Sequence, residues 1–161
     1  MTDTVLLIAW HSRTRASEAL ARAAFAGAGD AARLLRAEEV QPEDLLAARG
    51  YLFACPENLA TMSGAMKEMF DRCYYPVLGR IEGRAYATMI AAGSDGEGAQ
   101  RQIDRIATGW RLRRVAEQMI VNTNAQTPDA IMAPKSLDDE FLQQAQILGA
   151  GLAQGLESGI F

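Results

Sequence analysis

The chain has 161 residues, 49% of them hydrophobic, and this size and composition predict one domain, residues 1–161, that buries a sizeable core. Its formal net charge of −4 gives no electrostatic case for nucleic-acid binding, and Asp104 interrupts the arginine-rich segment 101–114. An acidic residue, Asp3, stands where a secretory signal carries a basic run, and no apolar stretch is long enough to cross a bilayer. We therefore expect a cytoplasmic protein with neither a nucleic-acid nor a membrane partner.

The cysteines and the histidine argue against two kinds of site. Cys55 and Cys73 are isolated in apolar stretches without the paired spacing of metal ligands, and His11 is the only histidine. We expect two free, buried thiols and no metal centre. The run Gly93–Gly96 lacks the spacing of a nucleophile elbow, so it does not predict a hydrolase.

Apolar runs separated by turn signals predict five strands. The first run, Val5–Trp10, is continuous rather than alternating, which is typical of a strand covered on both faces in a parallel sheet. The third run ends at Pro56, because proline cannot continue a central ladder. The predicted strands are Val5–Trp10, Ala32–Arg36, Gly50–Pro56, Ala85–Ala92 and a segment near Val115–Val121.

Helical periodicity fills the intervals between these strands. The first predicted helix stops at a glycine turn over 27–30, and the helix after the third strand begins at Ser63, a favourable N-cap residue. We expect the last helix, from 136 or 137 to about 156, to pack closely on the sheet through its glycines Gly149, Gly151 and Gly155. The predicted inward-facing residues are Leu20, Ala21, Ala24, Phe25, Met66, Met69, Phe70, Cys73, Ala99, Ile103, Ile106, Ala107, Trp110, Phe141, Ala145, Leu148 and Leu152. The other helices are predicted over 18–28, from Pro42 through Leu46 and along 99–110, with Asn122–Pro134 as a loop.

This alternation predicts an α/β fold: a doubly wound five-stranded parallel sheet with helices on both faces. Right-handed crossovers then place the loops after the first, third and fourth strands at one edge of the sheet. Ligands bind at that edge in this architecture, where the strand order reverses.

The loop after the first strand, Ser12–Ser17, is the leading candidate site. It carries three hydroxyls just before a helix N-terminus, where O–H groups, unpaired N–H groups and the helix dipole can surround one dianion. The alternative is an ordinary helix cap, since Ser and Thr are usual N-cap residues. The loop Glu57–Met62 follows the third strand, and the glycines of Gly93–Gly98 permit positive φ angles and the close approach of a ligand.

The segment Pro56–Arg72 resembles the loop and helix after the third strand of flavodoxin-like proteins, and among them of NAD(P)H-dependent FMN reductases and NAD(P)H:quinone oxidoreductases. In that pattern a proline, a variable turn, a small residue pair and a lysine lead into a helix that ends near an Asp-Arg pair. The resemblance covers nearly the whole chain and implies a flavodoxin-like strand order 2-1-3-4-5. It also implies that the backbone of Glu57–Met62 contacts the polar edge of an isoalloxazine ring, which needs fixed N–H donors.

The first loop resembles the phosphate loop of the same family, which commonly reads Ser-x-Thr-Gly-x-Thr. Ser12, Thr14 and Ser17 fall on its hydroxyl positions, but Arg15 stands where glycine is usual. If that position needs a positive φ, the arginine strains the loop; if it does not, Arg15 adds a cation beside the phosphate, alongside Arg13. The resemblance implies the cofactor-binding residues Ser12, Arg13, Thr14, Arg15, Ala16, Ser17, Pro56, Glu57, Asn58, Leu59, Ala60, Thr61, Met62, Gly93, Ser94, Asp95, Gly96 and Gly98, with no catalytic side chain and no metal ligand.

The function implied is an FMN-binding oxidoreductase in which NAD(P)H reduces the flavin and electrons pass to a small acceptor such as a quinone or free flavin. One alternative is a flavodoxin-like one-electron carrier without nicotinamide chemistry, and another is a flavodoxin fold that has lost its cofactor because of Arg15. A carrier typically has a strongly acidic docking face and aromatic residues flanking the ring, whereas the second loop here offers Leu59. The resemblance also allows a homo-oligomer.

Overall fold

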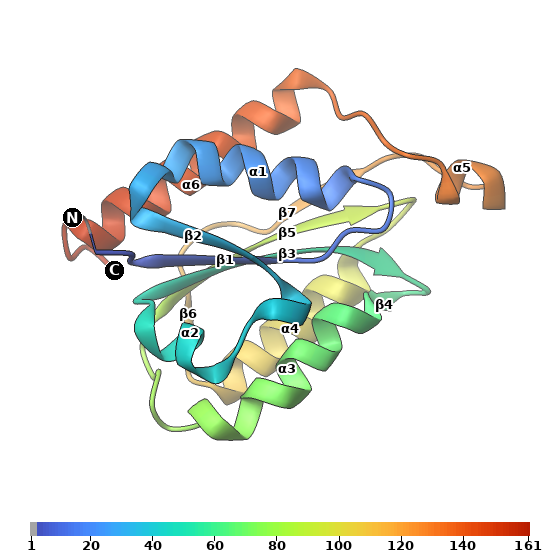
Figure 1. Cartoon of the computed structure of the whole chain (residues 1–161). Coiled ribbons are helices and arrows are strands. Elements are labelled where there is room, and N and C mark those ends of the chain that lie inside the picture. The colour runs from blue at the N-terminus through green and yellow to red at the C-terminus, as the bar shows by residue number, and fades with distance from the viewer. Residues whose placement is uncertain (1–2) are drawn as a thin grey trace.

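The computed structural model describes residues 3–161 as a twisted sheet between two layers of helices (Figure 1). The central strands run in the order β2-β1-β3-β5, all parallel, which is the predicted flavodoxin-like order. Within the described residues the sheet has seven strands rather than five. The strands are β1 (Leu6–Trp10), β2 (Ala32–Arg36), β3 (Gly50–Asn58), β4 (Thr61–Met62), β5 (Ala85–Ala92), β6 (Arg113–Arg114) and β7 (Met119–Asn122).

The two additional strands arise because the predicted fifth strand is split in two and the predicted third strand continues into a hairpin. The predicted fifth strand is split into β6 and β7, which both pair with β5, because the exposed Glu117 and Gln118 interrupt its apolar run. The third strand does not end at Pro56, which is still aligned with Ala91 of β5. It continues to Asn58 and turns back as β4 in an antiparallel hairpin, so the proline falls where the strand changes partners.

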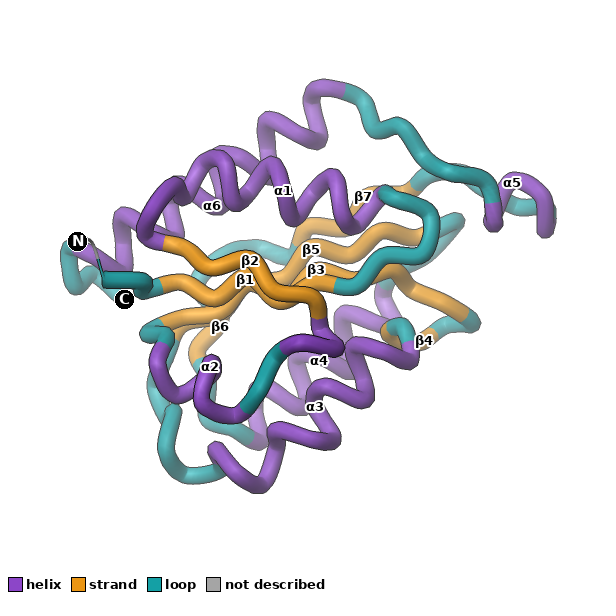
Figure 2. Tube along the Cα trace, viewed as in Figure 1, coloured by secondary structure: helices purple, strands orange, loops and turns teal. Residues whose placement is uncertain are grey.

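Helices cover both faces of the sheet, as predicted. Figure 2 separates α1 (Ala16–Ala28) and α6 (Asp139–Glu157) on one side from α2 (Pro42–Ala47), α3 (Gly64–Val77) and α4 (Glu97–Gly109) on the other. Two short 3-10 turns, Gly29–Ala31 and Ala37–Glu39, flank β2. The predicted loop Asn122–Pro134 contains one more helix, α5 (Pro128–Met132).

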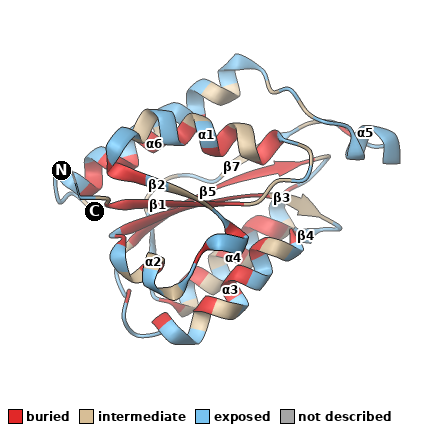
Figure 3. Cartoon of the chain, viewed as in Figure 1, coloured by how far each residue is buried: buried red, intermediate tan, exposed pale blue. Residues whose placement is uncertain are grey.

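The core lies on both faces of the sheet, and the central strands β1, β3 and β5 are its most buried part (Figure 3). Leu7 and Ala9 of β1 pack into the cluster under α3 and α4, whereas Leu6, Ile8 and Trp10 pack under α1 and α6. This division confirms that the continuous apolar run belongs to a strand covered on both sides. Cys55 and Cys73 are free and buried, as predicted, and burial raises the pKa of Cys55 to about 12.

Two predictions about helix packing were wrong. Phe25 does not face inward with the rest of its helix; it is 37% exposed, while Leu20 and Ala24 are fully buried. The close approach of Gly149 is to α1 rather than to the sheet, because a Cβ there would collide with the carbonyl of Ala24. Gly155 packs against the ring of Phe161, and space is open beside Gly151.

No helix within residues 3–161 is long and apolar enough to cross a membrane.

Candidate functional site

The loops after β1, β3 and β5 meet at the carboxyl ends of the strands, as predicted, and line one open pocket. Among the predicted residues, Ser12, Arg13, Thr14, Ala16, Ser17, Pro56, Glu57, Asn58 and Gly93 line it. The other predicted residues lie outside the lining: Arg15, Leu59, Ala60, Thr61, Met62, Ser94, Asp95, Gly96 and Gly98.

The phosphate-loop candidate, residues 12–17, is rich in unused donors. Within the described chain, no backbone N–H of residues 12–18 donates to a protein acceptor. The Ser17 hydroxyl lies in the first turn of α1 and is 1% exposed. It is the only buried side-chain N or O atom without a hydrogen-bond partner in residues 3–161. Buried polar groups are nearly always satisfied, so an orphaned hydroxyl in a pocket wall indicates a missing ligand or water.

Arg15 has a positive φ, the conformation that would explain why the family pattern has glycine at this position. It is the N-cap of α1 with φ 75° and ψ −10°, in the left-handed region that favours glycine. Its side chain is exposed and does not line the pocket. The position therefore does require a positive φ, and the arginine strains the loop by about 1–3 kcal/mol.

The second loop is a β-hairpin rather than an irregular loop. Its two tip residues, Leu59 and Ala60, have φ values of 53° and 66°, as a tight two-residue hairpin turn requires. Asn-Gly is the usual pair in such a turn, so this tip is also strained. Leu59 is 98% exposed at the tip.

Glu57 fastens this hairpin to α4. Its Oε1 accepts a hydrogen bond from the N–H of Gly96 at 2.8 Å, and its Oε2 accepts one from the N–H of Ala99 at 3.0 Å. A carboxylate at a helix N-terminus satisfies two unpaired donors and interacts favourably with the helix dipole. Glu57 therefore borders the pocket as a structural acceptor, with both oxygens already engaged.

The glycines of the third loop serve the fold more than the close approach of a ligand. Gly96 has φ 98°, one of the positive φ angles that these glycines were predicted to permit. A Cβ at Gly98 would collide with the carbonyl oxygen of Ala60, and one at Gly93 would collide with that of Ala125. These glycines therefore let neighbouring backbone segments approach the loop closely.

Four pocket residues come from a fourth loop, the segment after β7: Thr123, Ala125, Ile131 and Lys135. Thr123 is held by the carbonyl of Ala92, to which both its N–H and its hydroxyl donate. The sequence signal for these residues was the predicted fifth strand itself, because its carboxyl end reaches the same edge of a parallel sheet. The segment has no phosphate-loop pattern, and so it was not included in the predicted site.

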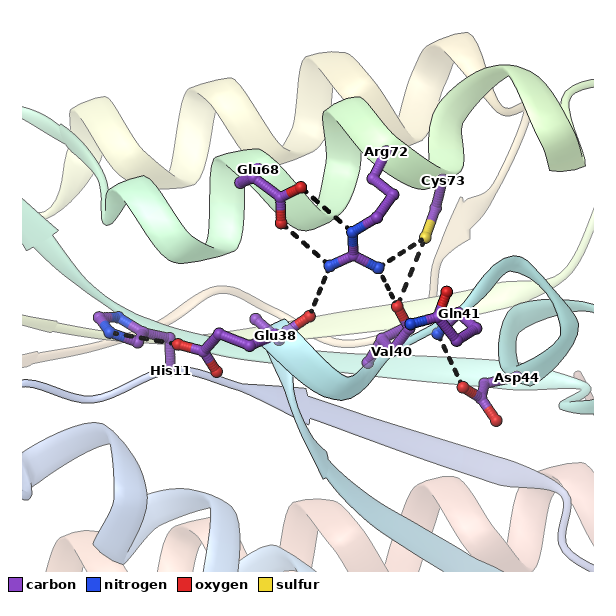
Figure 4. A network of polar contacts seen from close by, with 9 residues as sticks. His11, Glu38, Val40, Gln41, Asp44, Glu68, Arg72 and Cys73 are labelled. Carbon is purple, nitrogen blue, oxygen red and sulfur yellow. Dashed lines mark hydrogen bonds and ion pairs between the residues drawn. The ribbon is translucent and has the colours of Figure 1, made fainter.

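A polar network joins α3 to the turn after β2, and His11 at the end of β1 lies beside it (Figure 4). Arg72 of α3 donates to the carbonyls of Ala37 and Val40 and pairs with Glu68, which ties α3 to the turn after β2. His11 Nδ1 lies 2.9 Å from the hydroxyl of Ser63 at the start of α3.

The far nitrogen of His11, Nε2, lies 3.9 Å from the Glu38 carboxylate, on the turn that Arg72 holds. Burial lowers the pKa of His11 below its ordinary value; Glu38 opposes this shift, and Arg13 adds to it. A neutral imidazole at this position links the end of β1 to α3.

Comparison with known proteins decides the family. The model of the NADPH-dependent FMN reductases matches residues 38–126, more than half of the chain. The chain belongs to the NADPH-dependent FMN reductase family. The match includes the hairpin, α3 and the loop Gly93–Gly98, whereas the phosphate-loop candidate precedes it. A comparison with curated protein sequences finds no match.

Solved structures support the fold at low sequence identity. A flavodoxin from the domain Archaea has a TM-score of 0.79 at 15% identity, covering 96% of this chain and 99% of that one. A WrbA-like flavodoxin from Agrobacterium tumefaciens has a TM-score of 0.73 at 15% identity, covering 96% of this chain and 98% of that one. An NADPH-quinone reductase from P. pentosaceus has a TM-score of 0.64 at 14% identity, covering 91% of this chain and 97% of that one.

Family membership and fold together make this chain a flavin-binding oxidoreductase of flavodoxin-like fold. FMN and a nicotinamide nucleotide are the cofactors that the family implies.

Proposed function

We propose that this NADPH-dependent FMN reductase binds FMN in the pocket at the carboxyl ends of β1, β3 and β5, and passes electrons from NADPH to a small acceptor such as a quinone or flavin. The observation that carries the proposal is the Ser17 hydroxyl. It is buried in the pocket wall without a hydrogen-bond partner, at the first turn of α1. The oxygens of a phosphate group at this point would accept its hydrogen bond and others from the free N–H groups of residues 12–18.

The residues around Ser17 fit the phosphate end of FMN in kind as well as in place. Ser12 and Thr14 add hydroxyls to the same wall, and Arg13 adds a cation. The left-handed Arg15 turns the backbone into the first turn of α1, where the helix dipole favours an anion. Strain of this kind often marks a binding loop.

The ring end of the cofactor is assigned to the hairpin and the loop Gly93–Gly98. The N–H groups of Leu59 and Ala60 donate to no acceptor in the described chain, so they are free to meet the polar edge of a ring. Glu57 holds this hairpin against α4 through two hydrogen bonds. The donors are therefore fixed before a ligand arrives, as electrostatic preorganisation requires.

When bound, FMN supplies the hydride and electron-transfer chemistry. The chain binds the phosphate, orients the ring and leaves room for a substrate. Two ionisable groups of the lining are already engaged: Glu57 with two N–H groups and Lys135 with three carbonyl oxygens. This supports a mechanism without a protein general acid or base.

The lining favours a reductase over a one-electron carrier. Among the described residues that border the pocket, none is aromatic, and the hairpin tip carries Leu59. A carrier commonly flanks its ring with aromatic side chains, which would also cover the face that a nicotinamide must reach.

The direct test is to titrate purified apo-protein with FMN, with riboflavin as the control that lacks the phosphate. We expect FMN to shift its visible spectrum and raise the melting temperature, with riboflavin binding at least about tenfold more weakly. NADPH added without oxygen should then bleach the flavin. Unchanged spectra and melting with FMN would contradict the proposed pocket, and binding without bleaching would favour the carrier.

A further inference from the structure

The segment between β7 and α6 borders the phosphate end of the pocket from outside the core. We call residues 126–137 the strap; it contains α5, which has no buried residue. Figure 1 places α5 beyond the carboxyl ends of the strands, on the side of the loop that follows β1. Its Ile131 lines the pocket although it is 45% exposed. Of the strap, Leu137 packs against the core, whereas α5 borders the pocket without a buried residue.

One residue, Lys135, joins the strap to the phosphate loop. Its backbone N–H donates to the carbonyl oxygen of Thr14 at 2.7 Å. Its ammonium group donates to the carbonyls of Ala130, Ile131 and Ala133 at 2.7, 3.0 and 2.6 Å. The ammonium of Lys135 thus caps the carbonyls at the C-terminal end of α5, and its backbone N–H attaches the strap to the loop that holds the free donors.

The second contact between strap and loop is weak. Arg13 Nη1 lies 3.6 Å from the sulfur of Met132, and Met132 is 55% exposed. A segment with few buried contacts opens at low free-energy cost without unfolding the domain. Of the contacts of Lys135, the backbone N–H alone crosses from the strap to the loop, and the ammonium keeps the strap in the shape that presents this N–H to Thr14.

The ammonium of Lys135 is a poor candidate for a phosphate ligand. An ammonium has three N–H donors, and each of the three here faces a carbonyl of the strap. Binding a phosphate with this group would leave a carbonyl of α5 without its donor. Its geometry is that of a group that holds the strap.

We propose that Lys135 is a positioning residue that closes the strap over the phosphate end of the pocket and thereby sets how fast FMN enters and leaves. The proposal rests on the proposed function, because it takes FMN to be the occupant. Closure by the strap makes FMN a retained cofactor that stays bound between reactions rather than a product released in each cycle.

The test is to measure FMN binding kinetics with Lys135→Met, which keeps the apolar stem and the backbone N–H but removes the ammonium. Stopped-flow mixing of apo-protein with FMN gives the association rate, and displacement by excess competitor gives the dissociation rate. A strap that opens more often lets FMN in and out faster. We expect both rates to rise about tenfold, the effect of losing charged hydrogen bonds, while the equilibrium affinity changes by less than about threefold.

Lys67→Met is the matched control. Lys67 is the other lysine of the chain; it pairs with Asp71 on the surface of α3 and does not line the pocket. We expect both rates to equal those of the unchanged protein. Thermal unfolding of apo Lys135→Met should also be unchanged, because α5 buries no residue.

Two outcomes would overturn the role of Lys135. A faster dissociation with an unchanged or slower association would make Lys135 a direct phosphate ligand, and unchanged values of both would mean that the strap is no barrier. If the unchanged apo-protein does not bind FMN at all, the proposed function itself fails, and this result is distinct from either of the others.

Discussion

The two ends of the pocket differ in how their polar groups are satisfied. At the hairpin end, Glu57 accepts from the N–H groups of Gly96 and Ala99, and Gln102 accepts from the N–H of Met62 at 2.8 Å. At the phosphate-loop end, the Ser17 hydroxyl and a run of backbone N–H groups have no partner in the described chain. The first end is fastened by the protein's own contacts, although the N–H groups of Leu59 and Ala60 at its tip have no acceptor in the described chain, whereas in our proposal the second end is completed by a ligand. Substitutions at the first end should therefore change stability, and those at the second should change binding.

The largest expected effect is at the contact between hairpin and α4. Gly98→Ala places a Cβ against the carbonyl of Ala60, and backbone cannot move away as easily as a side chain. We expect a loss of about 3 kcal/mol in the free energy of unfolding, measured by urea denaturation of the apo-protein. Gly64→Ala is the control, since nothing lies within 4 Å of its added Cβ, and a loss as large as that of Gly98→Ala would remove the explanation.

The next effect is at the carboxylate that holds the two loops together. Glu57→Gln replaces one acceptor with an NH₂ group that faces an N–H, so we expect about 2 kcal/mol less stability. Glu97→Gln, in the first turn of α4 but bonded only to the Gln118 side chain, should change stability by less than about 0.5 kcal/mol. Equal effects of the two changes in chemical denaturation would show that Glu57 is not the clamp.

A smaller effect of opposite sign is expected at the phosphate loop. Arg15→Gly removes the strain of a φ of 75° and should stabilise the apo-protein by about 1 kcal/mol. Arg13→Gly lacks this benefit, because Arg13 does not have a positive φ, and should not stabilise the protein. Destabilisation by Arg15→Gly in thermal unfolding would mean that the arginine side chain contributes more than its backbone costs.

The smallest effect is the pH dependence that His11 contributes. Burial lowers its pKa in the folded protein, so the unfolded chain takes up this proton at a higher pH than the folded one. Its contribution to stability is complete above the ordinary value of 6.5 and is lost as the pH falls below it. The melting temperature should therefore fall by more between pH 7.5 and pH 5 for the unchanged protein than for His11→Gln. An equal fall in the two proteins would contradict this assignment.

Much of the fold follows from local sequence patterns. The strands Ala32–Arg36 and Ala85–Ala92 were predicted with the bounds observed, because turn residues flank each apolar run. The split of the fifth strand was not predicted, since an edge strand tolerates polar interruptions. The helix α5 was not predicted either, since a five-residue helix with no buried face has no periodicity to read.

The site was predictable only in part, for a related reason. Hydroxyls before a helix and loops at strand ends are local signals, and they indicated the three loops that meet at the pocket. The bond from Lys135 to Thr14 joins residues far apart in sequence, and the backbone strain at Leu59 and Ala60 has no signature in their side chains. Such features appear only when the chain is folded.

The measurement that tests the difference between the two ends most directly is Ser17→Ala, followed by both unfolding of the apo-protein and FMN binding. The substitution removes a buried hydroxyl that has no partner, so the apo-protein should become more stable by about 1 kcal/mol. The same substitution removes a donor to the phosphate, so FMN should bind about tenfold more weakly. If apo-protein stability falls and FMN affinity is unchanged, Ser17 belongs to the fold and the phosphate site lies elsewhere.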